Sequence, residues 1–208
     1  QRQMCIRDRR VVYDVKCSMN VEQAILEAGG RPVMARTGHS FMKRVLASMP
    51  ECKMAAEMSG HIFLADRGWY GFDCSLYNAA RLIELWSRRT PLDEGGPSFS
   101  SELDRLAPPL PTTGEVKVPC AEEHKVEVVA AITDAYADME SSTVDGVRVR
   151  FNNEAGEYVG WYLARKSNTE PVLVMRMEAT TEEQLNAMKA TADERVSSII
   201  NIEPLLNA

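Results

Sequence analysis

The sequence predicts two domains: an α/β domain with a βαβ unit and a mixed sheet, followed by a small α+β domain. Strand, helix and strand patterns succeed one another within residues 11–35, an order that implies parallel strands and a right-handed crossover. Six of the ten prolines fall between Pro91 and Pro119, so residues 91–114 are expected to be an interdomain linker. Residues 115–208 show strand and helix patterns of their own.

The first elements of the α/β domain, residues 11–90, follow from apolar spacing. Residues 11–16 favour a strand, and the helix after it has an apolar stripe that ends before two glycines. Residues 31–35 form the second predicted strand. Ser40 is a natural N-cap for a helix over residues 41–49. The stripe of the first helix consists of Val21, Ala24, Ile25 and Ala28.

A hairpin is expected next, because two short β-favouring runs flank a Ser-Gly pair. The runs cover residues 53–56 and 61–65, and Gly60 can adopt the positive φ that a tight reversal needs. Ser75 is placed to begin a further helix, whose apolar residues recur at helical spacing. They are Ala79, Leu82, Ile83, Leu85 and Trp86.

The second domain, residues 115–208, is expected to form a four-stranded sheet with two helices. Residues 122–139 have the period of the first helix, and Thr180 with Glu183 has the spacing of a capping box that opens the second. A short helix is also expected near residues 102–106 of the linker. The four strands are predicted at residues 115–119, 147–151, 158–165 and 171–178.

Composition and charge argue against several classes of function. A formal net charge of −6 over 208 residues makes a general affinity for nucleic acid unexpected. No apolar run approaches the ~20 residues of a membrane span, so no membrane partner is expected. The five cysteines are scattered without a C-x-x-C pair, which argues against a zinc site or a disulfide framework and favours a reducing, cytoplasmic setting.

The beginning of the chain has a different character from the rest. It reads QRQMCIRDR, has neither helical nor strand period, and does not start with methionine. The stretch resembles a translated adapter, so residues 1–10 are expected to be non-native and joined where a longer protein was cut.

Chemically active side chains are expected at one edge of the first sheet, because ligands of open α/β sheets bind at the carboxyl ends of parallel strands. Lys16 ends the first strand, and His39 follows the second. The hairpin tip carries Glu57, Ser59 and His61, and it reaches the same edge if its first strand is parallel to the others. A carboxylate can accept from vicinal hydroxyls, and Lys or His can move protons. This set suits a polyhydroxylated, anionic ligand, although the tip alone also fits a plain hairpin end.

A second candidate site lies in the second domain, where the segment RKSNTEP joins two strands. Arg165 provides a planar guanidinium, and Ser167, Asn168 and Thr169 provide small hydrogen-bonding groups. Such a set suits a phosphate group. The same composition also fits a polar turn ended by a proline.

Together, the motifs resemble those of the α-D-phosphohexomutases. In order, they are VVYDVKCS, GGRPVMARTGHSFMK, AEMSGHIFLADRGWYGFD, YNAARLIEL and DGVRVRF…GWYLARKSNTEPVLVMRMEA. The set is most similar to the bacterial phosphomannomutase/phosphoglucomutase branch and extends from Val11 to the last helix. The resemblance implies a protein of four domains, of which this chain carries most of the third and the fourth.

The resemblance also implies a role for each candidate residue. In this family the G-E-x-S-G-H loop holds sugar hydroxyls, which implies substrate binding by Glu57 and Ser59. Lys16 and His39, with His61 beside the loop, are implicated in binding and proton transfer as catalytic residues. The R-x-S-N-T loop grips the phosphate that does not react, which implies substrate contacts from Arg165, Ser167, Asn168 and Thr169.

The implied activity is that of an isomerase of carbohydrate metabolism, an intramolecular phosphotransferase. Such an enzyme interconverts the 1-phosphate and 6-phosphate of mannose or glucose through a phosphoserine and a hexose 1,6-bisphosphate, and the parent enzyme is expected to use Mg²⁺. The phosphoserine loop and the D-G-D-G-D-R magnesium loop do not occur in these 208 residues. The fragment is therefore expected to provide no metal ligand, to need its missing N-terminal half as a partner, and to be inactive alone.

Two departures and two alternatives accompany this resemblance. Ala56 stands where the family has glycine before the glutamate, and Asp73-Cys74-Ser75 stands where the family has Asp-Asp-Gly. A fragment of phosphoglucosamine mutase is one alternative, although that branch has Ser-Gly-Thr where this chain has Ser167-Asn168-Thr169. The other alternative is a non-catalytic module that binds sugar phosphates.

Overall fold

The structure is a computed structural model that describes residues 9–208, and it divides between Pro109 and Leu110 into two units, here unit 1 and unit 2. The expectation for residues 1–10 therefore concerns mainly residues that lie outside the described part of the chain. Arg10 is described, and it is already the first residue of the first strand. The cysteines of the described part, Cys17, Cys52, Cys74 and Cys120, are free thiols.

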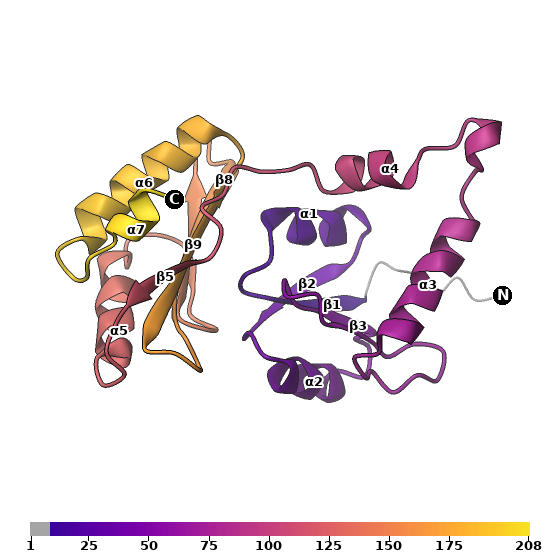
Figure 1. Ribbon diagram of the computed structural model, residues 1–208, viewed down its shortest axis with the longest axis horizontal. Helices are drawn as coiled ribbons and strands as arrows, with labels where there is room; N and C mark the ends of the chain where they lie inside the picture. Colours follow the sequence, from indigo (N-terminus) through magenta and orange to yellow (C-terminus); the bar gives the residue numbers. More distant parts are fainter. Residues whose placement is uncertain (1–8) are drawn as a thin grey trace. The chain divides into compact units, whose positions relative to one another are not determined.

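Unit 1 is built on a mixed four-stranded sheet in the order β2-β1-β3-β4 (Figure 1). β1 pairs in parallel with both β2 and β3, and β3 pairs with β4 as an antiparallel hairpin. The predicted βαβ unit and mixed sheet are thus confirmed. The elements are β1 (Arg10–Asp14), α1 (Met19–Glu27), β2 (Arg31–Ala35), α2 (His39–Ser48), β3 (Met54–Ala56), β4 (Ile62–Leu64), α3 (Ser75–Ser87) and α4 (Phe99–Leu106).

Helices α1 and α2 cover opposite faces of this sheet (Figure 1). Val12 and Phe63 are fully buried on the face toward α2, where Met42 packs against them. Tyr13 points to the other face and packs with Ile25 of α1. Because successive side chains of a strand point to opposite faces, the apolar run VVY can fill both layers at once.

Two helices of unit 1 begin differently from the prediction. The N-cap of α2 is Gly38 rather than Ser40, which is the second residue of the helix. Gly38 has φ 129°, a conformation open to glycine, so the chain can turn into the helix two residues earlier. Ser75 is likewise the first residue of α3, and its N-cap is Cys74 without a side-chain hydrogen bond.

The predicted linker contains more regular structure than the sequence indicated. A 3₁₀ turn covers Leu92–Glu94, and the predicted short helix, α4, begins at Phe99 and belongs to unit 1. It packs on α3 through an edge-to-face contact of Phe99 with Trp86, 5.0 Å between ring centroids. Glu102 is buried, and hydrogen bonds from Arg105 and then Arg89 lower its pKa to about 2. Ion pairs therefore help to hold α4 as a helix between the flanking Pro97 and Pro108.

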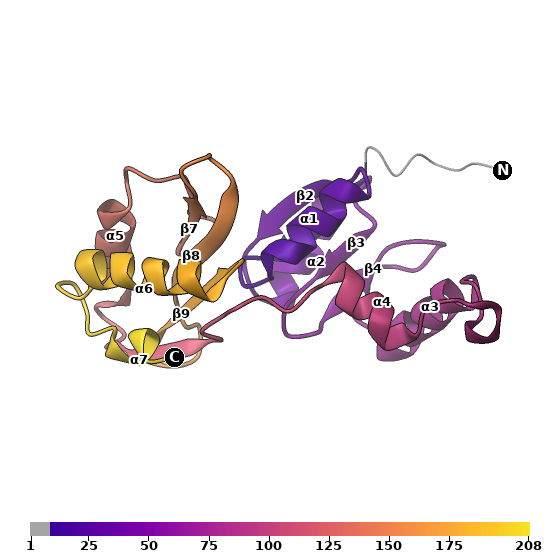
Figure 2. The same ribbon diagram turned by 90° about the horizontal axis from the view of Figure 1, so that it is seen from above.

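Unit 2 is an antiparallel sheet in the order β5-β9-β8-β7-β6, with its helices on one face (Figures 1 and 2). The predicted α+β class is confirmed. The sheet gains a fifth strand, β6, and α7 follows the predicted last helix, because two and four residues are too few to leave a period in the sequence. The elements are β5 (Val116–Pro119), α5 (Lys125–Ala135), β6 (Ser141–Ser142), β7 (Val147–Asn152), β8 (Tyr158–Lys166), β9 (Val172–Ala179), α6 (Glu182–Val196) and α7 (Glu203–Leu206).

The alternation of side chains along β8 separates the core of unit 2 from its other face. Tyr162 and Ala164 are fully buried against the helices, where Ile132 of α5 also lies. Trp161 and Arg165 point to the opposite face of the sheet. Arg165 is thus placed by the strand period on the face that the helices do not cover.

The N-cap of α6 lies one residue later than predicted. Thr181 is the N-cap, and its hydroxyl accepts a hydrogen bond from the backbone N–H of Gln184 at 3.2 Å. The backbone N–H of Thr180 donates to the carbonyl of Val159 in β8 at 2.9 Å, so Thr180 still continues the pairing of β9 with β8. Within residues 9–208, no helix is both long and apolar enough to cross a membrane.

Candidate functional site

The carboxyl ends of β1, β2 and β3 meet at one edge of the sheet in unit 1, and the loops after them carry the predicted residues. Lys16 follows β1, and His39 is the first residue of α2, directly after the loop that follows β2. Glu57 and Ser59 lie in the turn after β3, and His61 precedes β4. Because β3 is parallel to β1, the structure brings the hairpin tip to the same edge as the other two loops.

Glu57 links two of these loops. Its side chain is buried, with 6% exposed, and Oε1 accepts a hydrogen bond from the backbone N–H of Gly38 at 2.6 Å. The turn itself is closed by the backbone N–H of Glu57, which donates to the carbonyl of His61 at 2.9 Å. A carboxylate offers about four acceptor positions. Glu57 can therefore hold the start of α2 and still accept from the hydroxyls of a ligand.

The remaining predicted side chains of this edge differ in exposure. His39, Ser59 and His61 are exposed, and Nδ1 of His61 lies 2.5 Å from a carboxylate oxygen of Asp73. Lys16 is buried, with 9% exposed. Three of the groups are thus open to an incoming ligand, and the lysine lies deeper.

Asp14 is a residue of this edge that sequence reasoning missed. It is fully buried at the end of β1, and its carboxylate accepts from the backbone N–H of Lys16 at 3.2 Å and of Met58 at 3.4 Å. The hydroxyl of Thr37 donates to its other oxygen at 3.1 Å, and the Cys17 thiol also contacts it. One side chain therefore ties together the loops after all three parallel strands. A lone carboxylate inside the apolar run VVYDV is the signal that could have found it, since buried acids are rarely without partners.

The predicted phosphate loop of unit 2 follows β8, and Arg165 is its buried member. Arg165 has 5% exposed, and its Nε donates to Oδ2 of Asp145 at 2.8 Å. The Nη2 atom of Arg165 is also buried, and it has no hydrogen-bond partner within residues 9–208. A buried N–H group without an acceptor costs about 1–3 kcal/mol. The loop therefore has an unmet need for an acceptor, such as a phosphate oxygen.

Ser167 shapes the rest of this loop. Its Oγ accepts from the backbone N–H groups of Thr169 at 3.3 Å and Glu170 at 3.2 Å. A hydroxyl that accepts these bonds keeps its own proton for donation to an anion. Asn168 and Thr169 are exposed at the tip.

Lys125 holds the backbone of this loop in place, and sequence reasoning did not identify it. Only 1% of it is exposed, and its Nζ donates to the carbonyls of Ser167 and Glu170, each at 2.9 Å. It also forms an ion pair with Glu122 at 2.5 Å. Nothing in the segment EEHKVEVV distinguishes this lysine from one on the surface, because its partners lie in another part of the sequence.

Gly146 lets β8 come close to the turn before β7, beside Arg165. An added Cβ would lie 2.3 Å from the carbonyl oxygen of Ala164 and 2.7 Å from Cα of Arg165. Gly156 has the same φ, 79°, but an added Cβ there meets nothing within 4 Å. The two glycines thus form a matched pair that differs only in the close approach.

We expect Gly146→Ala to destabilise unit 2 more than Gly156→Ala. The positive φ should cost each variant about 1–2 kcal/mol. Overpacking against β8 should raise the loss for Gly146→Ala to about 2–5 kcal/mol. Urea unfolding followed by circular dichroism measures both values, and equal losses would show that the close approach has no energetic consequence.

The described residues do not fit the Mg²⁺ ion that the resemblance implies. Within residues 9–208, no group of three His, Cys, Asp or Glu side chains is placed to hold a metal ion. A divalent ion of this kind is bound through several converging oxygen ligands. No chemical step is therefore assigned to a metal on this part of the chain.

Comparison with known proteins finds the same family over both units. The family profile described as phosphoglucomutase/phosphomannomutase, alpha/beta/alpha domain III, matches residues 1–97. The profile of the C-terminal domain of the same family matches residues 115–195. Both candidate sites therefore fall within regions that this family shares.

Individual relatives bear the same names. A phosphomannomutase/phosphoglucomutase of Pseudomonas syringae is 37% identical over 195 residues, which is 93% of this chain and 37% of that protein. A phosphoglucomutase of Neisseria gonorrhoeae is 34% identical over 201 residues, 95% of this chain and 39% of that protein. A crystal structure of a phosphoglucomutase/phosphomannomutase family protein of Burkholderia thailandensis aligns with a TM-score of 0.73 and 36% identity, over 91% of this chain and 37% of that one.

The chain thus spans less than two fifths of the length of these relatives. The two profiles follow one another in the order in which the two units occur. Unit 1 corresponds to domain III and unit 2 to the C-terminal domain. The chain therefore belongs to the phosphoglucomutase/phosphomannomutase family, of which it carries these two domains.

Proposed function

We propose that this chain is the sugar- and phosphate-recognising part of a phosphomannomutase/phosphoglucomutase. Such an isomerase moves a phosphoryl group between the 1 and 6 positions of a hexose through a phosphoserine and a hexose 1,6-bisphosphate. The observation that carries the proposal is the buried Nη2 of Arg165, which has no hydrogen-bond acceptor among residues 9–208 and lies in a loop of further donors. The names of the relatives support the same assignment.

The edge of unit 1 is proposed to read the sugar ring. Glu57 accepts from two neighbouring hydroxyls while Gly38 keeps its carboxylate in place, and Ser59 adds a hydroxyl contact. Lys16, His39 and His61 are the groups that bind the reacting end and move its proton. A hydroxyl that attacks a phosphoryl group must lose its proton, and an exposed imidazole can accept it.

The loop of unit 2 is proposed to hold the phosphate that does not react. The guanidinium of Arg165 presents a planar fork, and Asp145 holds its Nε so that the other nitrogens face the anion. Ser167, Asn168 and Thr169 provide further donors at the tip. A clamp that recognises phosphate rather than sugar can serve both orientations of the bisphosphate.

The phosphoserine and the Mg²⁺ ligands are assigned to the part of the parent protein that corresponds to the remaining length of its relatives. The missing N-terminal half is then the partner of this chain, and the chain alone is expected to be inactive. The four described free thiols fit a cytoplasmic enzyme. The relatives named above favour a phosphomannomutase/phosphoglucomutase over a phosphoglucosamine mutase.

A chimaeric enzyme tests this function. The chain replaces the corresponding 37% of the Pseudomonas syringae relative, and conversion of mannose 1-phosphate and glucose 1-phosphate is measured. We expect activity from the chimaera and none from the 208-residue chain alone.

In parallel, NMR titration of the chain with glucose 1-phosphate should shift signals of Glu57 and Arg165, whereas glucose should leave Arg165 unchanged. An inactive, folded chimaera together with no response to glucose 1-phosphate would refute the proposal.

A further inference from the structure

Asp73 lies against the imidazole of His61, at the end of the loop that joins β4 to α3. Oδ2 of Asp73 is 2.5 Å from Nδ1 of His61, and its Oδ1 accepts from the backbone N–H of Ile62 at 3.4 Å. The side chain of Asp73 is 30% exposed, and that of His61 is 50% exposed. Because both oxygens of the carboxylate are engaged on the same strand end, its orientation toward the ring is defined.

Backbone pairing brings these two side chains together. Asp73 forms an antiparallel β-bridge with Phe63, so the chain after the loop runs beside β4. Asn78 of α3 also donates from Nδ2 to the carbonyl of Ile62 at 2.9 Å. The contact therefore does not depend on two long, mobile side chains meeting on a surface, which is the usual weakness of exposed ion pairs.

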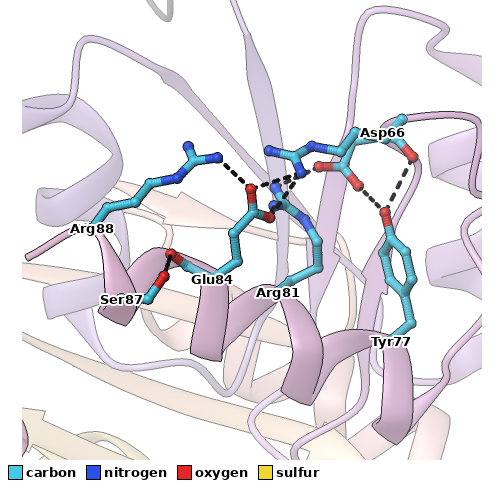
Figure 3. Close-up of polar contacts among 7 residues, drawn as sticks. Asp66, Tyr77, Arg81, Glu84, Ser87 and Arg88 are labelled. Carbon is cyan, nitrogen blue, oxygen red and sulfur yellow. Dashed lines mark hydrogen bonds and ion pairs between the residues drawn. The ribbon is translucent and has the colours of Figure 1, made fainter.

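The loop that carries Asp73 is anchored to α3 at its other end as well. Asp66 accepts from the hydroxyl of Tyr77 and from Arg81, each at 2.7 Å, and Arg81 also bonds to Glu84 (Figure 3). The ring of Trp69 stacks on Tyr77 with 4.6 Å between centroids. The segment between β4 and α3 is thus held along its length, and Asp73 directly precedes Cys74, the N-cap of α3.

The chemistry of this contact fixes the proton of the imidazole. An ionised carboxylate can only accept, so Nδ1 must carry the proton that it donates to Asp73. In the neutral ring Nε2 then has the free lone pair and is the basic atom. A carboxylate that binds one ring nitrogen in this way sets both the tautomer and the orientation of the ring.

We propose that Asp73 is a positioning residue for His61. It holds the Nδ1–H tautomer, so that Nε2 is the atom that accepts a proton from the sugar hydroxyl at the hairpin tip. When the hydroxyl oxygen forms its new bond to the phosphorus of the phosphoserine, the bond from that phosphorus to the serine oxygen breaks and its electron pair stays on the serine oxygen. The hydroxyl proton moves to Nε2 of His61, and the imidazolium formed is stabilised by the same carboxylate. This inference rests on the proposed function for the identity of the hydroxyl, but the tautomer itself does not.

The tautomer can be measured on the 208-residue chain without any enzymatic assay. Long-range ¹H–¹⁵N correlation NMR of the neutral ring should show Nδ1 of His61 protonated and Nε2 unprotonated. Asp73→Asn keeps the shape of the side chain but can place an amide N–H against Nδ1, and we expect it to shift the ring toward the Nε2–H tautomer. Asp104→Asn, an exposed position on α4, is the matched control and should leave the His61 signals unchanged.

The same variants in the chimaera separate positioning from binding. Asp73→Asn should lower kcat by about 10- to 100-fold, the scale seen when the partner of an oriented histidine is removed, and should leave KM within about twofold. Asp73→Glu, which can still accept from Nδ1, should recover part of kcat. An unchanged tautomer in Asp73→Asn would overturn the proposal, whatever the activity. A changed tautomer with unchanged kcat would instead leave Asp73 as the partner of His61 and remove His61 from the proposed proton transfer.

Discussion

Replacement of Arg165 by alanine is expected to weaken binding of glucose 1-phosphate and mannose 1-phosphate by about 10- to 100-fold. A hydrogen bond to a charged group contributes about 1.5–3 kcal/mol, and about 1.4 kcal/mol corresponds to a tenfold change in affinity. Arg165 is buried and has an unpartnered Nη2, so the ligand would supply an acceptor that the described chain does not. KM of the chimaera and the Kd of the 208-residue chain should rise together.

Two further variants show whether the loss of affinity is specific to the predicted phosphate loop of unit 2. Arg165→Lys keeps the charge but not the planar guanidinium, and we expect its affinity for hexose phosphate to lie between those of the unmodified chain and of Arg165→Ala. Arg150→Ala removes a guanidinium of the same sheet that stacks on Tyr158, and it should leave the affinity unchanged. Thermal unfolding of the two Arg165 variants reports on the loss of the ion pair between Arg165 and Asp145. A folded Arg165→Ala protein that binds hexose phosphate with unchanged Kd would contradict the assignment.

The elements of this fold were predictable where their apolar period is long. Met175 and Met177 of β9 are fully buried, and Ile25 is the buried residue of the stripe predicted for α1, whereas Ala24 and Ala28 of that stripe are exposed. The sequence alone did not show whether β3 runs parallel to β1. Strands of three residues are too short for their apolar pattern to indicate which strand they pair with. Pairing with β1 settles it.

Side chains that organise the candidate site were harder to foresee because their partners are distant in sequence. Met58 is 44 positions from Asp14, and Ser167 is 42 positions from Lys125. Residue chemistry suggested which groups could meet a ligand, but the groups that hold them depend on pairings which only the folded chain creates. Asp73 is the clearest case, since the sequence drew attention only to the segment Asp73-Cys74-Ser75, which departs from the family's Asp-Asp-Gly at its second and third positions.

Replacement of Asp14 by alanine is expected to have the largest effect on stability among the substitutions considered, about 3–5 kcal/mol. The carboxylate is fully buried, and its removal leaves the backbone N–H groups of Lys16 and Met58 and the hydroxyl of Thr37 without this acceptor. A typical hydrogen bond contributes about 0.5–1.5 kcal/mol, and one to a charged group about 1.5–3 kcal/mol. Since small domains are stable by only about 5–15 kcal/mol, such a loss would bring unit 1 close to unfolding.

The Asp14→Asn variant distinguishes charge from shape. One amide oxygen can still accept, but the amide nitrogen would face a donor, so we expect a loss smaller than that of Asp14→Ala and loosening confined to one side of the site. Hydrogen exchange of amides in β1, β3 and the three loops measures this, with the exposed Asp104→Ala as the control. If Asp14→Ala retained the exchange protection of the Met58 amide, the loops would be held by their own turns instead. Because the loops that carry Lys16, His39 and Glu57 meet at Asp14, their loosening should lower sugar-phosphate affinity even where unit 1 stays folded.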